Sequence, residues 1–158
     1  MHNEHMTKSA LPKPIIIDLP YQSIDDKAEI EKAFVEQLGY ETLSAVERET
    51  LHYIFDYQTV YVVHSKKRNQ HTLRPEYTVY VGETNNIRSR TMQHLREDPN
   101  TRVDWKEFQE NLQSDARSVW QYVIGNPHFN KSLTLDVEHR LMHYLLGSDA
   151  VKNLNNRR

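Results

Sequence analysis

Cysteine is absent from this chain of 158 residues, which excludes a disulfide framework, a thiolate metal site and a cysteine nucleophile. Glycine occurs only four times, and neither the P-loop pattern nor the dinucleotide-binding glycine pattern is present, which disfavours a nucleotide-hydrolysing role. No apolar run approaches the roughly 20 residues of a membrane helix, and the N-terminus lacks the hydrophobic segment of a secretory signal. We therefore expect a cytoplasmic protein with no membrane partner.

The composition instead describes one globular domain with a local basic segment. The chain is 37% hydrophobic and 27% charged, and 158 residues suffice for a single core. Its net charge of −2 conceals an uneven distribution. Residues 1–60 carry five basic and eleven acidic side chains, whereas residues 61–102 carry eight basic and four acidic ones. Most charge clusters are solvated surface, but this one suits a phosphate-bearing partner.

The N-terminal third predicts a tail followed by two helices. Residues 1–13 are expected to be a disordered tail, and residues 14–56 to form an N-terminal helical extension, in which "PIIIDLP" is a short strand or an extended arm. The first helix begins at an N-cap, Ser23 or Asp25, and ends at Gly39. The second lies in "TLSAVERETLHYIFD". Helical spacing predicts these inward-facing residues: Ile30, Phe34 and Leu38 in the first, and Leu43, Val46, Leu51 and Ile54 in the second.

Two β-branched and aromatic runs, "YQTVYVVHS" and "EYTVYVGE", predict a hairpin, joined by a basic loop "HSKKRNQHTLRP". Side chains alternate between the two faces of a strand. Val60 and Val62 therefore share one face of the first run, as do Val79 and Val81 in the second, and Tyr61 and Tyr80 take the other. If the valine face packs on the core, the two tyrosines line one common surface.

Helix and strand patterns continue to the C-terminus. "ETNNIRSRTMQHLRED" predicts a helix capped by Thr84 or Asn85, in which Arg90 and His94 are neighbours at i, i+4. The inward-facing residues of this helix are Ile87, Thr91 and Leu95. Three more elements follow. They are a short helix "VDWKEFQENLQ", a strand "SVWQYVIGN" covered on both faces, and a helix "LTLDVEHRLMHYLLG" capped by Thr134 and ended by Gly147. The predicted class is α+β: a small antiparallel sheet of about three strands flanked by helices, with residues 57–158 as the main domain.

This order of motifs resembles the GIY-YIG nuclease family over Tyr57 to Asn156. The second motif reads Y-V-G-x-T-x-N-I-x-x-R-x-x-x-H from Tyr80 to His94, and a helix with Glu138 and the asparagines of "NLNN" follow later. The first motif is looser, because Thr59-Val60 stand where the family has Gly-Ile. The 18 residues between the two tyrosines also exceed the usual spacing of the family. A hairpin loop absorbs such an insertion.

The resemblance implies a phosphodiester-cleaving site that uses one divalent cation, Mg²⁺ or Mn²⁺. It implies these roles by position: Tyr61 activates or positions the attacking water, Tyr80 shapes the same surface, Arg90 holds the phosphate, His94 follows one turn later, and Glu138 binds the metal. The late asparagine is Asn155, with Asn153 and Asn156 as close rivals. A tyrosine has an ordinary pKa of about 10. We therefore expect that the metal or Arg90 depresses the pKa of the tyrosine, or that the tyrosine passes its proton on through water.

The predicted partner is nucleic acid, most simply DNA. Lys66, Lys67, Arg68 and Arg88 are candidates for contacts with the phosphate backbone. Domains of this family generally owe their targets to attached domains. We therefore expect a covalently attached helicase-like or DNA-binding module beyond the C-terminus.

Two alternatives stay open. In the first, the chain is a catalytically inactive module of the GIY-YIG fold, for nucleic-acid binding or interaction. In the second, it is a zinc hydrolase that uses His139 and His143. The two histidines are i, i+4 on one helix, but the H-E-x-x-H order of zincins is missing and no third ligand is obvious. Each site residue alone has an ordinary structural explanation, since tyrosine is common in strands and exposed arginine on helices. Only their joint spacing favours the nuclease.

Overall fold

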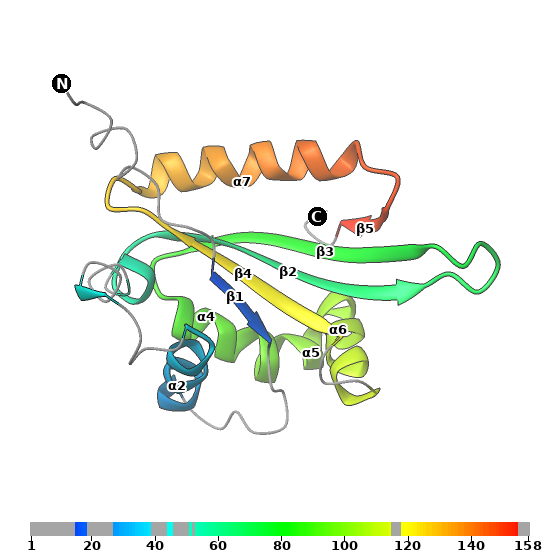
Figure 1. Cartoon of the computed structure of the whole chain (residues 1–158), viewed down its shortest axis with the longest axis horizontal. Helices are drawn as coiled ribbons and strands as arrows, with labels where there is room; N and C mark the ends of the chain where they lie inside the picture. Colours follow the sequence, from blue (N-terminus) through cyan, green and yellow to red (C-terminus); the bar gives the residue numbers. More distant parts are fainter. Residues whose placement is uncertain are drawn as a thin grey trace.

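The computed structural model describes residues 15–18, 27–38, 44, 45, 51, 53–114 and 118–154. Its elements in chain order are β1 (Ile15–Asp18), α2 (Lys27–Leu38), β2 (Thr59–Arg68), β3 (Pro75–Thr84), α4 (Ile87–Met92), the π-helix η3 (Gln93–Glu97), α5 (Asp98–Thr101), α6 (Val103–Ser114), β4 (Val119–Gly125), α7 (Lys131–Leu146) and β5 (Val151–Leu154). The fold is α+β, as predicted (Figure 1). None of the helices in this part of the chain is long and apolar enough to cross a membrane.

The described strands form one five-stranded sheet in the order β1-β4-β2-β3-β5. Neighbouring strands are antiparallel except β3 and β5, which are parallel. The predicted sheet of about three antiparallel strands was therefore too small. For "PIIIDLP" the sequence left a short strand or an extended arm open, and Ile15–Asp18 is the strand. Val151–Leu154 was not expected to be a strand. Both are four residues long, so periodicity carries little signal for either.

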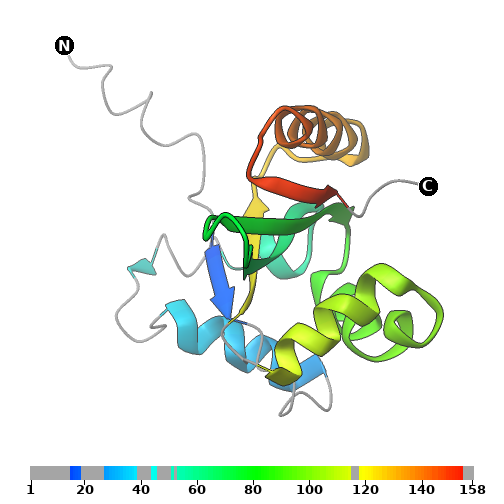
Figure 2. The same cartoon turned by 90° about the vertical axis from the view of Figure 1, so that its right-hand side faces the viewer.

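Helices cover both faces of the sheet. α7 lies on one face, while α2, α4 and α6 lie on the other (Figures 1 and 2). The face under α7 carries Val60, Val79 and Val81, and we call it the valine face. The opposite face carries Tyr61 and Tyr80, and we call it the tyrosine face. Both faces contain buried clusters, so the core has two layers rather than one.

The N-terminal segment contributes to the same sheet and core as the rest of the chain. β1 pairs with β4, with Ile15 opposite Val123, and Ile30 of α2 is buried on the tyrosine side. Leu51 and Ile54 are buried there as well, as predicted. β1 thus joins the predicted N-terminal extension to the sheet of residues 57–158, and the boundary between residues 56 and 57 stays a prediction. The tail, the predicted caps of the first helix, Leu43 and Val46 lie outside the described residues.

Two helix caps differ from the predictions. Asn86, not Thr84 or Asn85, caps α4, and its side chain accepts a hydrogen bond from the Ser89 amide. Asn130, not Thr134, caps α7 by accepting from Leu133, which leaves Thr134 fully buried one turn inside the helix. Asparagine is as good a cap as threonine, so the choice between adjacent candidates follows from where the strand ends. The inward-facing residues predicted for α4 and its continuation, Ile87, Thr91 and Leu95, are all buried.

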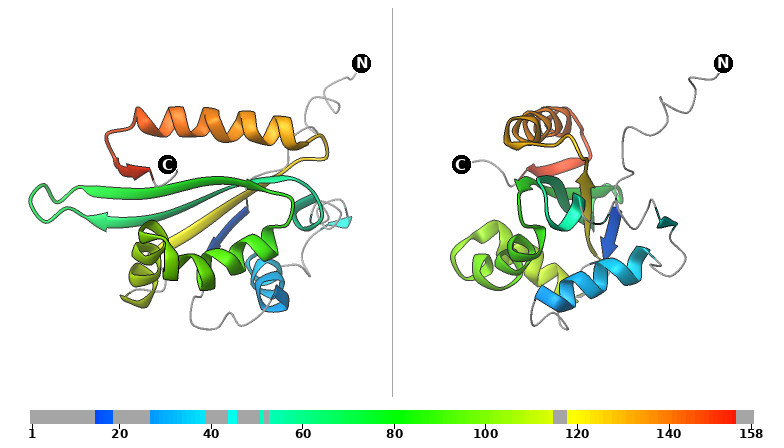
Figure 3. Two further views of the ribbon diagram at one scale, coloured as in Figure 1. Left: turned by 180° about the vertical axis from the view of Figure 1, so that it is seen from behind. Right: turned by 90° about the vertical axis from the view of Figure 1, so that its left-hand side faces the viewer.

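The hairpin of β2 and β3 extends past the other strands. β4 pairs with β2 only as far as Ser65, and β5 pairs with β3 only from Tyr77. The β2–β3 pairing continues to Arg68 and Pro75, which makes a free two-stranded ribbon (Figure 3). The predicted basic loop over residues 64–75 was therefore too long. Its basic cluster lies in the exposed end of β2.

Candidate active site

Tyr61 and Tyr80 stand side by side on the tyrosine face. Their ring centroids are 6.1 Å apart and the planes are tilted by 32°. The predicted common face is confirmed, but it is not an open surface. Tyr61 is 1% exposed and Tyr80 is 8% exposed, because helices cover this face. Strand alternation identified which residues share a face and could not show that both faces are buried.

Gly82 makes room for the Tyr61 ring. The two residues are directly opposite in the β2–β3 register. A Cβ atom at position 82 would lie 2.5 Å from Tyr61 Cζ and Oη, closer than Cβ contacts in real proteins. Since Tyr80 and Gly82 are two residues apart on one strand, the glycine lets the tyrosine of the neighbouring strand lie flat beside Tyr80. This packing role of Gly82 was missed in the sequence.

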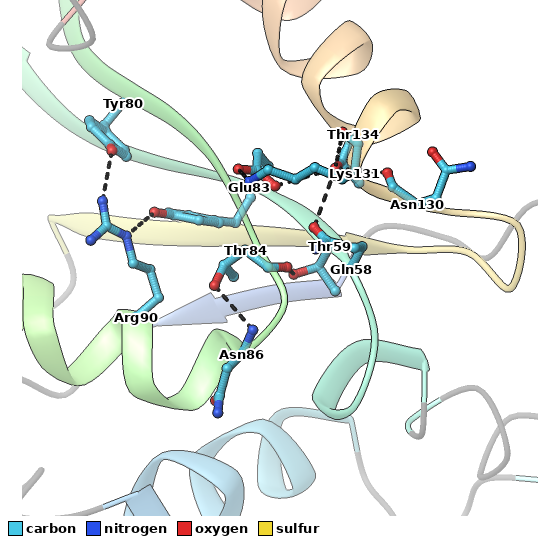
Figure 4. Close-up of polar contacts among 11 residues, drawn as sticks. Gln58, Thr59, Tyr80, Glu83, Thr84, Asn86, Arg90, Asn130, Lys131 and Thr134 are labelled. Atoms are coloured by element: carbon cyan, nitrogen blue, oxygen red, sulfur yellow. Dashed lines mark hydrogen bonds and ion pairs between the residues drawn. The ribbon is translucent and has the colours of Figure 1, made fainter.

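Arg90 and His94 meet at the Tyr61 hydroxyl. His94 Nε2 lies 2.6 Å from Tyr61 Oη, and Arg90 Nε donates to the same oxygen at 3.3 Å. Arg90 Nη2 also donates to Tyr80 Oη at 3.4 Å (Figure 4), and Nη1 donates to Gln93 Oε1 at 2.6 Å. The structure therefore brings together four predicted residues from two strands and one helix.

The helix that carries these residues changes geometry between them. Arg90 belongs to α4, whereas His94 lies in the π-helical segment η3. A π-helical turn has poorer packing than an α-helix and occurs often at functional sites. The single helix predicted over this stretch is thus three consecutive helical segments. The π-helical segment carries His94, which contacts the hydroxyl of Tyr61.

Asp98 and Trp105 hold His94 from its other sides. Asp98 Oδ2 lies 2.6 Å from His94 Nδ1, and the indole of Trp105 stacks on the imidazole at 3.7 Å and 10°. Asp98 is also 3.9 Å from Arg102, whose guanidinium contacts Asp104 at 2.7 Å. The i, i+4 spacing of His94 and Asp98 was visible in the sequence and was not used. Nothing local to Trp105 indicated its contact with the histidine.

Burial dominates the electrostatics of this cluster. It raises the pKa of Tyr61 well above the ordinary value of a tyrosine; Tyr80 adds to this effect, and Arg90 opposes it. The expected depression of the tyrosine pKa by Arg90 is therefore outweighed. Burial, together with the charges of Arg90 and Arg102, lowers the pKa of His94 to about 2. At neutral pH the hydroxyl and the imidazole are both uncharged.

The depressed pKa of His94 predicts a stability that falls with acidification. The folded protein keeps His94 neutral down to about pH 2, whereas the unfolded chain protonates it near pH 6.5. The unfolded state thus binds more protons between these values, so this group should lower the free energy of unfolding by about 1.4 kcal/mol per pH unit below pH 6.5. Urea unfolding of the wild type and His94→Gln between pH 7 and pH 5 measures the difference in slope.

His71→Gln is the matched control, because His71 is exposed in the ribbon turn. We expect it to keep the wild-type slope, while His94→Gln loses most of it. Burial also lowers the pKa of His64 and raises that of Asp98, which contribute with the same and the opposite sign, respectively. Equal slopes for His94→Gln and the wild type would contradict a buried neutral imidazole.

Glu138 comes from a different layer. It lies on α7, which packs on the valine face, and it is half-buried. Contacts of Lys131 and Thr134 with Glu83 tie the start of α7 to β3 (Figure 4). α7, which carries Glu138, and the two tyrosines therefore lie on opposite faces of the sheet. The convergence of Glu138 with the tyrosines stays a prediction.

The remaining predicted residues are spread over the molecule. Asn155 and Asn156 lie outside the described residues, and Asn153 is in β5 opposite Thr78. Arg88 lies 3.4 Å from Asp56 and its guanidinium is 5.1 Å from the Phe55 ring centre, so it contacts the N-terminal segment. The basic cluster of the ribbon is exposed; it consists of Lys66, Lys67 and Arg68.

Clusters of metal-ligating side chains are absent from the part of the chain that the structure describes. No group of three or more histidine, aspartate or glutamate side chains placed to hold an ion occurs there. The zinc alternative therefore gains no third ligand for His139 and His143, both of which are exposed on α7. A single carboxylate such as Glu138 suits a hard cation that keeps most of its waters, as Mg²⁺ does.

Comparison with known proteins adds no relative. No family model, no curated protein and no solved structure matches this chain. The function must therefore be argued from the side chains and their geometry.

Proposed function

We propose that this chain is a metal-dependent endonuclease domain of the GIY-YIG type, which hydrolyses phosphodiester bonds in DNA. The observation that carries the proposal is the guanidinium of Arg90, held between the hydroxyls of Tyr61 and Tyr80 at 3.3 Å and 3.4 Å. These three residues are the ones that the two tyrosine motifs place together. A cation fixed before the substrate arrives stabilises developing charge without reorganisation during the reaction.

Arg90 retains donors for a phosphate. A guanidinium has five N–H groups, and the bonds to Tyr61, Tyr80 and Gln93 use one each of Nε, Nη2 and Nη1. The second hydrogen of each Nη atom is therefore left for a ligand. Two such hydrogens form the fork that binds two oxygens of one phosphate, a geometry that lysine does not provide.

Exposure divides the cluster into an outer and an inner pair. Arg90 is half-buried and Tyr80 is 8% exposed, whereas Tyr61 and His94 are only 1% and 3% exposed. Arg90 and Tyr80 are thus the groups placed to touch a substrate. Tyr61 and His94 support them from behind, which reverses the order of importance that the motifs alone implied for the two tyrosines.

Glu138 is the proposed ligand of Mg²⁺ or Mn²⁺. Its half-buried carboxylate suits a cation that is bound mainly by water and substrate oxygens. When bound, the ion supplies neutralisation of phosphate charge and a lowered pKa of a bound water. The residues of the chain orient the phosphate through Arg90 and accept hydrogen bonds at the tyrosine hydroxyls.

The exposed ribbon is the proposed contact for the nucleic-acid backbone. Lys66, Lys67 and Arg68 are exposed on β2, and Arg74 is exposed in the turn that follows. Contacts of this kind position a duplex without reading its sequence. Target choice would then come from a covalently attached helicase-like or DNA-binding module.

A non-catalytic nucleic-acid-binding module is the second candidate. The burial of Tyr61 and His94 favours it, because a satisfied polar network stabilises a core whether or not chemistry takes place there. Both candidates share the fold and the ribbon. Only cleavage distinguishes them.

The proposal predicts metal-dependent cleavage that requires Glu138. We expect supercoiled plasmid and branched DNA to be cut in Mg²⁺ or Mn²⁺ and to stay intact in EDTA. Glu138→Gln should reduce cleavage to the level without metal, because the amide that replaces the carboxylate carries no charge to hold the ion. Glu110→Gln, which changes an exposed glutamate of α6 on the other side of the sheet, is the matched control and should cleave like the wild type.

Three outcomes decide the proposal. Cleavage by the wild type that Glu138→Gln abolishes supports it. Cleavage that survives in Glu138→Gln places the metal or the activity elsewhere. DNA binding without cleavage in either metal favours the binding module.

A further inference from the structure

We infer that Asp98 is a positioning residue, which fixes His94 in the tautomer with hydrogen on Nδ1 and so leaves Nε2 to accept a hydrogen bond from the hydroxyl of Tyr61. The inference rests on the proposed function for its catalytic part and on the geometry alone for the tautomer. Asp98 is 6% exposed, and its Oδ2 lies 2.6 Å from His94 Nδ1. No resemblance to the nuclease motifs covers this residue.

The charge state of Asp98 determines which atom holds the hydrogen. An ionised carboxylate can only accept, so the shared hydrogen then belongs to Nδ1. Arg102 Nη1, 3.9 Å from the same Oδ2, favours the ionised form. Burial raises the pKa of Asp98 and Arg102 opposes that rise. The contact with Arg102 is the observation on which we assign the acceptor role to the aspartate.

The imidazole has little freedom to choose another arrangement. Trp105 stacks on its face at 3.7 Å with nearly parallel planes, and Asp98 holds its Nδ1 edge. The opposite edge then points Nε2 at Tyr61 Oη, 2.6 Å away. With hydrogen on Nδ1, Nε2 has a free lone pair, and the Tyr61 hydroxyl must donate to it.

The direction of the remaining hydrogen bonds follows. Tyr61 has one hydroxyl hydrogen, which goes to His94, so its oxygen accepts from Arg90 Nε. The oxygen of Tyr80 accepts in turn from Arg90 Nη2. Arg90 thus joins the oxygens of the two tyrosines, and Tyr61 joins Arg90 to His94.

This arrangement makes the Tyr61 oxygen an acceptor for Arg90. With its only hydrogen directed to His94 Nε2, Tyr61 presents a lone pair to Arg90 Nε, and the guanidinium stays where it bridges the two tyrosines. The raised pKa of Tyr61 and the lowered pKa of His94 keep both groups uncharged. The network therefore positions Arg90 for the phosphate and does not take the proton of the attacking water.

The tautomer can be read without any activity. A chain labelled with ¹⁵N in its histidines gives long-range ¹H–¹⁵N correlations that distinguish a protonated Nδ1 from a protonated Nε2. We expect His94 to show a protonated Nδ1 and a bare Nε2 at pH 7, and Asp98→Asn to lose this pattern. A protonated Nε2 in the wild type overturns the inference, and so does a pattern that Asp98→Asn leaves unchanged.

The catalytic part is tested by the same variant in the cleavage assay. Asp98→Asn should lower kcat by about 100-fold or more with KM within about twofold, because a misplaced guanidinium loses an interaction that is made in the transition state. Asp98→Glu should recover part of the loss. Asp104→Asn removes a neighbouring carboxylate that contacts Arg102 instead of His94, and it should keep the wild-type kcat.

The outcomes separate this inference from the proposed function. Cleavage by the wild type with an unchanged kcat in Asp98→Asn overturns the positioning role and leaves the nuclease intact. A wild type with the expected tautomer and no cleavage in any metal overturns the nuclease and leaves the tautomer assignment standing. If Asp98→Asn fails to fold, the wild-type spectrum and the kcat of Asp98→Glu still decide.

Discussion

Alanine at position 82 should lower the free energy of unfolding by about 3 kcal/mol, the upper part of the range for overpacking in a core. The added Cβ would lie 2.5 Å from Tyr61 Cζ and Oη. The ring cannot retreat easily, because it is 1% exposed and its hydroxyl contacts both His94 and Arg90. Urea unfolding of wild type and Gly82→Ala, followed by tryptophan fluorescence, measures the change.

Gly147→Ala is the matched control for this substitution. Its Cβ would meet its nearest neighbour, the carbonyl oxygen of Tyr144, at 3.5 Å, an ordinary contact. We expect a change within about 0.5 kcal/mol. In a Tyr61→Ala background, Gly82→Ala should also cost little, since the ring that it strikes is gone. An equal cost of Gly82→Ala in both backgrounds would show that the clash with Tyr61 is not the cause.

Arg90→Ala should reduce the rate of DNA cleavage by about 1,000-fold, the lower end of the effect of a phosphate-stabilising arginine. The guanidinium is the cation nearest both tyrosine hydroxyls, and its loss removes both the phosphate fork and the frame that positions it. Arg90→Lys should recover little, because an ammonium cannot bridge Tyr61, Tyr80 and a phosphate together. Initial rates of plasmid cleavage in Mg²⁺ at saturating DNA report the change in kcat.

Arg140→Ala provides the charge-matched comparison. Arg140 is an exposed residue of α7 that pairs with Asp136 at 3.0 Å, and its removal should leave the cleavage rate unchanged. Circular dichroism and urea unfolding must show that Arg90→Ala is folded, since the variant leaves two buried hydroxyls with fewer partners. A folded Arg90→Ala chain with the wild-type rate would exclude the proposed role of the arginine.

Several features of this protein could be predicted from the sequence because their causes are local. Alternation of side chains in "TVYVV" and "TVYVG" placed Tyr61 and Tyr80 on one face, and the structure confirms it. The i, i+4 spacing of Arg90 and His94 predicted that they are neighbours, and both contact Tyr61 Oη. Burial of Ile87, Thr91 and Leu95 followed from the helical period in the same way.

Features that depend on contacts between distant segments were not predictable in this way. Periodicity states which side chains share a face but not what covers it, so the burial of the tyrosine face depended on where α2, α4 and α6 pack. The register that sets Gly82 against Tyr61 arises only when β2 and β3 pair. The lengths of the ribbon and of the sheet likewise depend on which strands find partners.

The sequence by itself determined the α+β class, the hairpin, the shared face of the two tyrosines and the stripe of Arg90 and His94, because each follows from a period of 2 or 3.6 residues along the backbone. Only the tertiary structure decided that these groups are buried, that Trp105 stacks on His94, and that α7 with Glu138 lies on the opposite face. Those facts depend on packing between segments far apart in the chain. The free energy of this packing comes from burying the apolar faces of helices and sheet against each other, which no local pattern specifies.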